Sequence, residues 1–196
     1  MKLPNLLFVA FALSGFSSAI PTPEADQLEP ITGTIISTGV TEKGEPYTIT
    51  ADFVELTDEK LALLGETPGN ATSGLEKRGG FGAGVNCNQW YENKYCYCSG
   101  AISNRGDSYW GSQDFCNTHK FKNFRNGELY TVKWLPTVKI EYWVTNTCDH
   151  DRYVGDNCGA IFLDLIDWCE WSWQTAKGGH QHFDDCLWFR FDVNGR

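Results

Sequence analysis

The sequence predicts an α+β fold for residues 79–196: a disulfide-stapled, two-layer α/β sandwich in which two helices cover one antiparallel sheet. The hydrophobic patterns of this region follow the order strand, helix, strand, strand, helix, strand, which is a split βαβ arrangement. The region also holds all eight cysteines of the chain, and an even number in a secreted protein indicates a disulfide framework. They are Cys87, Cys96, Cys98, Cys116, Cys148, Cys158, Cys169 and Cys186. The pairing stays open, because eight cysteines can pair in many ways.

The first half of this cysteine-rich region (79–196) predicts a strand, a helix and a second strand. Residues 86–99 are rich in aromatic residues and cysteine, which is typical of a strand or another extended segment. Asp107-Ser108 is an N-cap signal, and the helix behind it is expected to run through about His119. Asn126-Gly127 predicts a turn, and the alternation over Glu128–Leu135 predicts the strand that follows it.

The second half predicts a strand, a helix and a last strand. Val138–Asn146 gives the clearest strand pattern, because its apolar residues recur at every second position. A helix is expected over Gly159–Trp171, with Asp156 or Asn157 as its cap. Cys158, at the start of this helix, and Cys169 lie near one face of it. We therefore expect both cysteines to link the helix to the sheet. Cys186–Val193 alternates between apolar and polar residues and predicts the last strand.

Residues 1–19 predict a secretory signal peptide. Lys2 precedes the apolar run Leu3–Phe16, and Ser17-Ser18-Ala19 supplies the small residues of a cleavage site. The alternative is a membrane anchor, but this run is shorter than the roughly 20 residues that cross a bilayer. We therefore expect a secreted, extracellular protein that does not insert into membranes.

Residues 20–78 predict an acidic propeptide, with 4 basic and 11 acidic residues and neither Cys nor Trp. It ends at Lys77-Arg78, in glycine-containing surroundings where proteases find access. This dibasic pair resembles the cleavage site of kexin-type proteases in fungal pre-pro-proteins, so a protease of that type is an expected partner. Asn70 begins an Asn-Ala-Thr sequon and is an expected glycosylation site.

The propeptide carries some secondary-structure signal of its own. Residues 32–38 and 47–54 read as strands, and residues 58–64 read as a short helix. With so few aromatic residues, this segment is expected to fold weakly, or only against something else. Its negative charge could mask cations of the cysteine-rich region, or the segment could assist oxidative folding.

The charge of the cysteine-rich region argues against nucleic acid as a partner. The region holds 11 basic and 14 acidic residues, whereas a nucleic-acid-binding domain normally shows a strong basic surplus. We expect a monomer.

Several motifs in this region resemble the killer toxins that a virus of smut fungi encodes. They are Gly84-Val85-Asn86-Cys87, Thr147-Cys148 after the strand Val138–Asn146, Gly155-Asp156-Asn157-Cys158 followed ten residues later by Cys169, and the final strand Leu187–Val193. Together they cover about half of the region. The family is that of the killer protein four type, with relatives in many fungal genomes. The resemblance implies a five-stranded antiparallel sheet, two antiparallel helices and a secreted toxin that blocks calcium uptake through channels.

The candidate target contacts are basic residues between the first helix and the clearest strand. The activity of the family is associated with a lysine before a Cys-Gly pair, and no cation here directly precedes one. The candidates are Lys120, Lys122, Arg125 and Lys133. The first three alternate with Phe121 and Phe124, a combination that suits an acidic channel mouth. The alternative is an ordinary solvated loop.

Metal binding is not expected. Residues 178–185 contain two histidines and two aspartates, which are ligand types for divalent ions. We expect instead a polar loop before the last strand, with His180 and His182 pointing apart. No metal or cofactor is therefore assigned.

Two further alternatives are a secreted ribonuclease and a wall-polysaccharide binder. A ribonuclease would need a histidine as acid and a carboxylate as base. The candidates are His119, His150, His180 or His182 with Glu92, Glu128 or Glu141. Since no spacing selects a pair, no catalytic residue is assigned and an enzyme is not expected. A polysaccharide binder would use Trp168, Trp171 and Trp173, although core packing is the commoner role, and Trp188 is the better exposed aromatic.

The sequence thus favours a secreted fungal effector, similar to killer toxins, that acts by binding. Its expected partner is a protein on the surface of a target cell, and the resemblance implies a calcium channel.

Overall fold

A computed structural model describes residues 30–55, 87, 90–172, 174–184 and 186–196. The strands of the main sheet are β1 (Thr34–Val40), β2 (Pro46–Glu55), β3 (Trp90–Tyr91), β4 (Lys94–Cys96), β7 (Gly127–Trp134), β8 (Val138–Asn146), β12 (Gly178–His182) and β13 (Leu187–Gly195). The helices are α2 (Arg105–His119) and α3 (Cys158–Trp168). The shorter strands are β5 (Ser103–Asn104), β6 (Asn123–Phe124), β9 (Arg152–Tyr153), β10 (Glu170–Ser172) and β11 (Thr175–Ala176).

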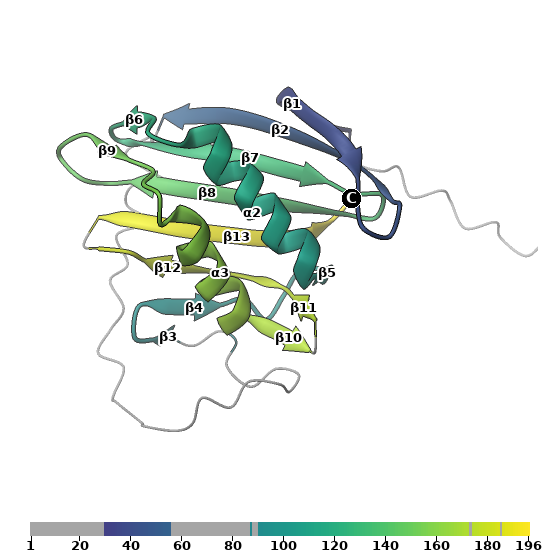
Figure 1. Cartoon of the computed structure of the whole chain (residues 1–196). Helices are drawn as coiled ribbons and strands as arrows, with labels where there is room; N and C mark the ends of the chain where they lie inside the picture. The colour runs from purple at the N-terminus through teal and green to yellow at the C-terminus, as the bar shows by residue number, and fades with distance from the viewer. Residues whose placement is uncertain (1–29, 56–86, 88–89, 173, 185) are drawn as a thin grey trace, which may run out of the picture.

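The main sheet has eight antiparallel strands in the order β1-β2-β7-β8-β13-β12-β4-β3. Both helices lie side by side on one face of it (Figure 1). This arrangement confirms the predicted disulfide-stabilised α+β fold with two layers. Six of the eight strands belong to the cysteine-rich region, namely β3, β4, β7, β8, β12 and β13. The resemblance implies five.

All eight cysteines form disulfides, as the sequence predicts. The pairs are Cys87–Cys98, Cys96–Cys169, Cys116–Cys158 and Cys148–Cys186. Cys169 links the end of α3 to strand β4, as expected. The expectation that Cys158 also links α3 to the sheet is wrong, because its partner Cys116 lies on α2. That bond holds the two helices together.

The core fills the space between the helices and the sheet. The apolar residues of β8 and β13 alternate as predicted, and those that face the helices are buried. Phe162 of α3 lies at the centre, with its ring edge-on to Phe115, Tyr142 and Phe189 at centroid distances of 5.4, 5.7 and 5.3 Å. Gly111 lets α2 approach, since a Cβ there would lie 2.4 Å from the Tyr142 hydroxyl oxygen.

The helix ends differ from the predicted ones. Helix α2 begins at Arg105, and Asn104 is its cap, because the Asn104 Oδ1 atom accepts a hydrogen bond from the Gly106 amide at 2.8 Å. Asp107 therefore lies inside the first turn. Helix α3 stops at Trp168 rather than near Trp171, because the residues after Cys169 enter strand β10, which pairs with β11.

Residues 178–182 form strand β12 and not the polar loop that we expected. The strand pairs on one side with β13 and on the other with β4, so its backbone hydrogen bonds are supplied by its neighbours. Side chains two residues apart in a strand share a face. His180 and His182 therefore point to the same side of the sheet, contrary to the expectation.

The two strands predicted in the propeptide are both present as β1 and β2. They form an antiparallel hairpin, and β2 pairs with β7 along eight residues, from Thr48 opposite Trp134 to Glu55 opposite Gly127. The hairpin thus pairs with another part of the chain, in line with one of the two expectations. The signal peptide, the predicted helix 58–64, Asn70 and Lys77-Arg78 lie outside the described residues.

Candidate functional site

The face of the main sheet that points away from α2 and α3 carries a continuous row of aromatic and basic side chains. Residues directly opposite one another in paired strands share a face. The registers place six residues opposite one another in succession across six strands: Tyr130, Trp143, Arg190, His180, Tyr95 and Trp90. We call these six residues the aromatic row. Each of them is partly exposed.

Neighbouring rings of the aromatic row stack on one another. The ring centroids of Tyr130 and Trp143 lie 5.2 Å apart, and the Arg190 guanidinium carbon lies 3.9 Å from the Trp143 ring. The His180 and Tyr95 rings stack at 5.1 Å, and Trp90 meets the His180 ring edge-on at 5.0 Å. Stacking between a guanidinium and an indole is a favourable cation–π contact. These contacts restrict the rotamers of the side chains that make them.

Polar side chains on both sides of the row hold it in place. The Tyr130 hydroxyl donates to Glu141 Oε1 at 2.5 Å, and the Asn194 amide donates to Glu141 Oε2 at 2.8 Å. Further along the row the Tyr97 hydroxyl lies 3.1 Å from His180 Nδ1. Tyr130 and His180 are therefore each attached to a hydrogen-bond partner outside the row.

Burial sets the charge states along the row. Burial, followed by the nearby Arg190 charge, lowers the pKa of His180 to about 4, so its imidazole is neutral at neutral pH. Burial also lowers the pKa of His182 and raises that of Asp192. The positive charge within the row at neutral pH is therefore that of Arg190.

The arrangement is suited to binding a flat or apolar group while the Arg190 guanidinium donates hydrogen bonds. Trp, Tyr and Arg are the residue types enriched among the strongest contributors to protein interfaces. Of this face, the sequence pointed to Trp188, whose ring contacts His182 beside the row, but not to Trp143 or Arg190. The sequence did contain a signal for these two residues. Tyr142 and Phe191 point into the core, so the alternation of each strand places their neighbours Trp143 and Arg190 on the opposite face.

The chain matches no known protein family, no curated protein and no solved structure. The resemblance to killer toxins therefore rests on the sequence motifs and stays a prediction. What the protein does is inferred from its own side chains.

Three of the four predicted contact cations lie together in one segment. Lys120, Lys122 and Arg125 are exposed in the segment between α2 and β7. Lys120 pairs with Asp156 at 2.7 Å, and Lys122 lies 6.0 Å from the Phe53 ring of β2. Their role as target contacts stays a prediction.

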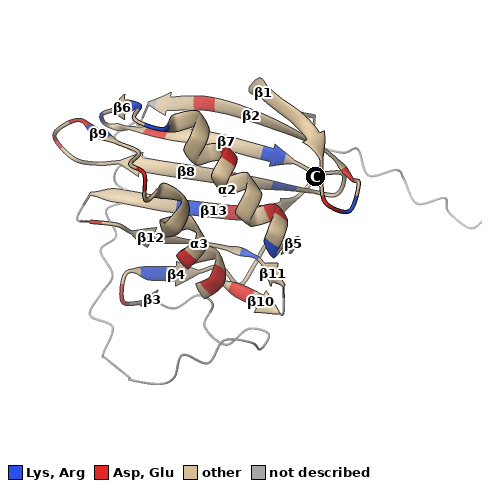
Figure 2. Ribbon diagram, viewed as in Figure 1, with Lys and Arg blue, Asp and Glu red and all other residues tan. Residues whose placement is uncertain are grey.

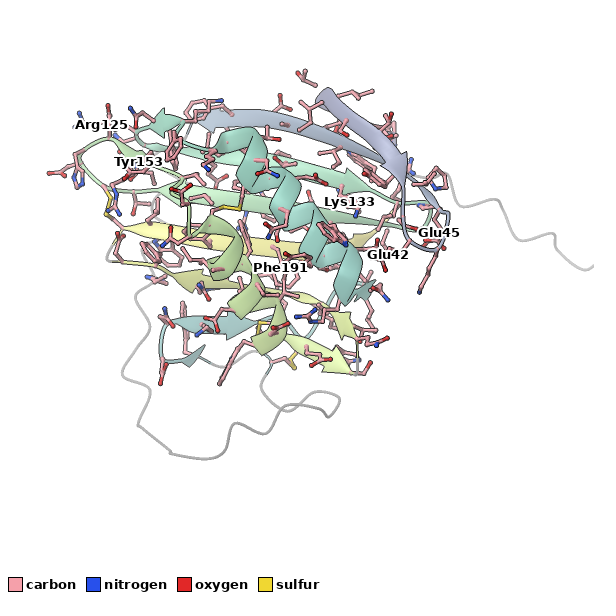
Figure 3. The ribbon with its side chains drawn as sticks, viewed as in Figure 1. Glu42, Glu45, Arg125, Lys133, Tyr153 and Phe191 are labelled. Carbon is pink, nitrogen blue, oxygen red and sulfur yellow. A yellow bond between two sulfur atoms is a disulfide. The ribbon has the colours of Figure 1, made fainter. Side chains whose placement is uncertain are left out.

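Lys133 lies apart from these three cations. Arg125 lies just before the start of β7, and Lys133 lies near the end of that strand (Figure 3). In Figure 2 the basic residues at the two ends of β7 form two separate blue regions. The Lys133 side chain is 3% exposed, with the ammonium 3.6 Å from Asp107 and 4.7 Å from the Tyr47 ring centroid. Burial lowers the pKa of Lys133, although the charge of Asp107 opposes the shift. In the full chain the ammonium is covered.

The structure separates several of the histidines and carboxylates considered for a ribonuclease. His119 is buried on the helix side of the sheet, and His150 lies between β8 and β9. His180 and Glu141 share the helix-free face, but β13 lies between their strands, which separates the backbones by about 10 Å. Glu128 is fully buried, and the Thr145 hydroxyl donates to it at 2.8 Å. Among the described residues no group of three or more His, Cys, Asp or Glu is placed to hold a metal ion.

Two of the tryptophans considered for sugar binding lie beside lysine ammonium groups. Trp168 is partly buried against the core, with the Lys94 ammonium 5.5 Å from its ring. Trp171 lies under the Lys177 ammonium at 3.8 Å, and Trp173 lies outside the described residues.

In the part of the chain that the structure describes, no helix is long and apolar enough to cross a membrane.

Proposed function

We propose that the cysteine-rich region is a secreted, killer-toxin-like effector that acts by binding a protein on the surface of a target cell through the aromatic row. The observation that carries this proposal is the position of Trp143, with the Tyr130 ring and the Arg190 guanidinium stacked beside it. Because these groups stand on a paired sheet, binding orders few side chains and loses little entropy.

Secretion is supported by the disulfides. Four disulfides among the described residues are typical of proteins from oxidising compartments. The predicted signal peptide points in the same direction. A sheet cross-linked in this way also keeps a binding surface in shape outside the cell.

The resemblance to killer toxins supplies the expected effect on the target, which is inhibition of calcium uptake through a channel. The Arg190 guanidinium and the cations Lys120, Lys122 and Arg125 give two alternative surfaces for an acidic channel mouth. We favour the aromatic row, because the exposed charges of the Lys120–Arg125 segment contribute little when water and salt screen them, and Lys120 is already paired with Asp156.

A wall polysaccharide is the second candidate ligand. The partly exposed rings of Trp143 and Trp188 favour it, since indole faces stack on the apolar faces of sugars. This ligand would bind to insoluble chitin or glucan, which a channel-directed protein would not do.

The test is growth and calcium uptake in fungal and plant cells exposed to the oxidised protein, with excess external calcium as a rescue. Inhibition that calcium rescues supports the proposal. Trp143→Ala is expected to weaken inhibition at least about tenfold, which corresponds to about 1.4 kcal/mol of binding. The matched control is Trp110→Ala on α2, where the side chain is 51% exposed on the helix side.

Three outcomes would contradict the proposal or redirect it. Full potency of Trp143→Ala would exclude the aromatic row. Equal loss in Trp110→Ala would show that the effect is not local to that row. Depletion of the protein on chitin or glucan, abolished by Trp143→Ala, would favour the polysaccharide instead.

A further inference from the structure

Strand β7 is the edge strand of the sheet that the cysteine-rich region forms by itself. The order within that region is β7-β8-β13-β12-β4-β3, so one side of β7 has no partner from the same region. In the full chain this side is paired with β2 of the predicted propeptide (Figure 1). We call residues 34–55, which hold β1 and β2, the pro-hairpin.

The pro-hairpin binds β7 through its inner strand. Ile49 is fully buried opposite Lys133, and Thr50 accepts a hydrogen bond from the Trp134 indole at 3.0 Å. The Tyr47 ring lies over the Lys133 ammonium. These side-chain contacts, added to the paired backbone, resemble the way an extended peptide binds to the open edge of a sheet.

The outer strand of the pro-hairpin contributes little burial. Six of the seven residues of β1 are exposed, and Ile35 is 60% exposed. An isolated two-stranded hairpin is at best marginally stable in water. The pro-hairpin therefore depends on β7 for its order.

We propose that the edge of β7 is a binding site for an extended peptide, and that the chain's own residues 46–55 occupy it as a tethered ligand. Cleavage between the pro-hairpin and Cys87 converts this ligand into an exchangeable one. The site selects a peptide with an aliphatic side chain opposite Lys133, a hydroxyl within reach of the Trp134 indole and an aromatic ring over the Lys133 ammonium.

Tethering explains why cleavage matters. A covalent tether keeps a bound segment at a high effective concentration, on the order of a millimolar for a short one, whereas a cut segment binds according to its own affinity and the total concentration. The cut hydrolyses one peptide bond with one water molecule and leaves a carboxylate and an ammonium. Lys77-Arg78 is the one dibasic pair in the sequence, so a kexin-type protease offers a selective means of making it.

Release of the pro-hairpin also changes what the surface displays. Departure of Tyr47 and Ile49 uncovers Lys133, which then faces solvent beside Asp107. It also opens the cavity of about 340 Å³ that the hairpin turn forms with the start of α2, lined by Glu42, Asn104 and Asp107 among others. The predicted contact residue Lys133 thus becomes accessible by cleavage.

The experiment compares the uncut full chain with the chain cut by a purified kexin-type protease. The probe is a fluorescent synthetic peptide of residues 31–55, and binding is followed by fluorescence polarisation. We expect saturable binding to the cut chain and at least tenfold weaker binding to the uncut chain. The Ile49→Asp peptide should bind at least tenfold more weakly, while the Ile35→Asp peptide is the matched control and should bind normally.

Because the changes are made in the peptide, they do not affect folding of the protein. Near-ultraviolet circular dichroism of the cut chain, before and after exchange, reports whether the cysteine-rich region stays folded. Equal binding of the two variant peptides, or failure of any peptide to enter the cut chain, would overturn the proposal. Loss of the dichroism signal when the hairpin leaves would also overturn it, since the hairpin would then be part of the core. Binding is measured without cells and so does not depend on the target proposed above.

Discussion

Lowering the pH from 7 to 4 is expected to destabilise the fold through His119. This residue ends α2, is 3% exposed and lies with its Nε2 atom 3.0 Å from the Thr131 hydroxyl oxygen. Its ring contacts that of Phe115 at a centroid distance of 4.7 Å. Burial, followed by the charge of Lys122, lowers the pKa of His119 from 6.5 to about 4.

The sign and size of the effect follow from that shift. Between pH 6.5 and about 4 the unfolded chain carries the proton and the folded chain does not. The contribution of His119 to the free energy of unfolding is therefore fully present above pH 6.5. It falls as the pH drops, by about 1.4 kcal/mol per unit for one group. The loss for His119 is about 3 kcal/mol by pH 4, a large part of the roughly 5–15 kcal/mol that stabilises a domain.

Urea denaturation at a series of pH values measures this loss. His180, with a pKa of about 4 in the folded protein, adds a similar dependence. The variant His119→Gln keeps a side chain able to bond Thr131 but does not titrate. Between pH 6.5 and 4 the slope of its free energy of unfolding against pH should be smaller than that of the wild type by about 1.4 kcal/mol per unit. Equal slopes for the two proteins would refute the assignment, because the carboxylates common to both contribute equally.

Three other perturbations test the fold by urea denaturation at neutral pH. Removing the disulfide Cys96–Cys169, which spans 73 residues, should cost about 4 kcal/mol, and removing Cys87–Cys98, which spans 11, about 3 kcal/mol; the reverse order would contradict the chain-entropy account. Phe162→Ala should cost about 3–5 kcal/mol, because three aromatic rings lose their shared neighbour. Asn104→Ala should lower the free energy of unfolding by about 1 kcal/mol, because it removes the N-cap of α2. An unchanged free energy of unfolding would indicate that Asp107, and not Asn104, is the cap.

Strands β8 and β13 could be predicted from the sequence because each has one buried face. In β8 and β13 the apolar residues alternate without interruption, so the pattern alone gave nearly the observed bounds. Strand β12 has no such pattern, since its residues are Gly178, Gly179, His180, Gln181 and His182. Its extended form comes from pairing with β13 and β4, which no local pattern reveals.

The helix ends depended on contacts beyond the helix. Asn104 and Asp107 are both good cap residues, and the local sequence did not distinguish them. For α3, the apolar pattern continues to Trp171, but the chain leaves the helix after Trp168, where Cys169 bonds to Cys96. Tertiary links of this kind override local preference.

The aromatic row could be predicted only in part. The sequence shows that Trp143 and Arg190 lie on the polar side of their strands. That they stand opposite each other, with His180 and Tyr130 on either side, depends on the strand order and register. Cross-strand neighbours are far apart in the sequence, so only the folded sheet brings them together.

The two proposals meet on strand β7, which suggests a last comparison. Tyr130, at one end of the aromatic row, lies directly opposite Asp52 of the pro-hairpin. A target that extends along the row past Tyr130 would meet the hairpin, so the cut chain should inhibit calcium uptake at lower concentration than the uncut chain. The control is the variant with Lys77→Gln and Arg78→Gln, treated with the same protease. Equal potency of cut and uncut protein would show that the row and the β7 edge act separately, because an obstacle beside the row would then have no effect on target binding.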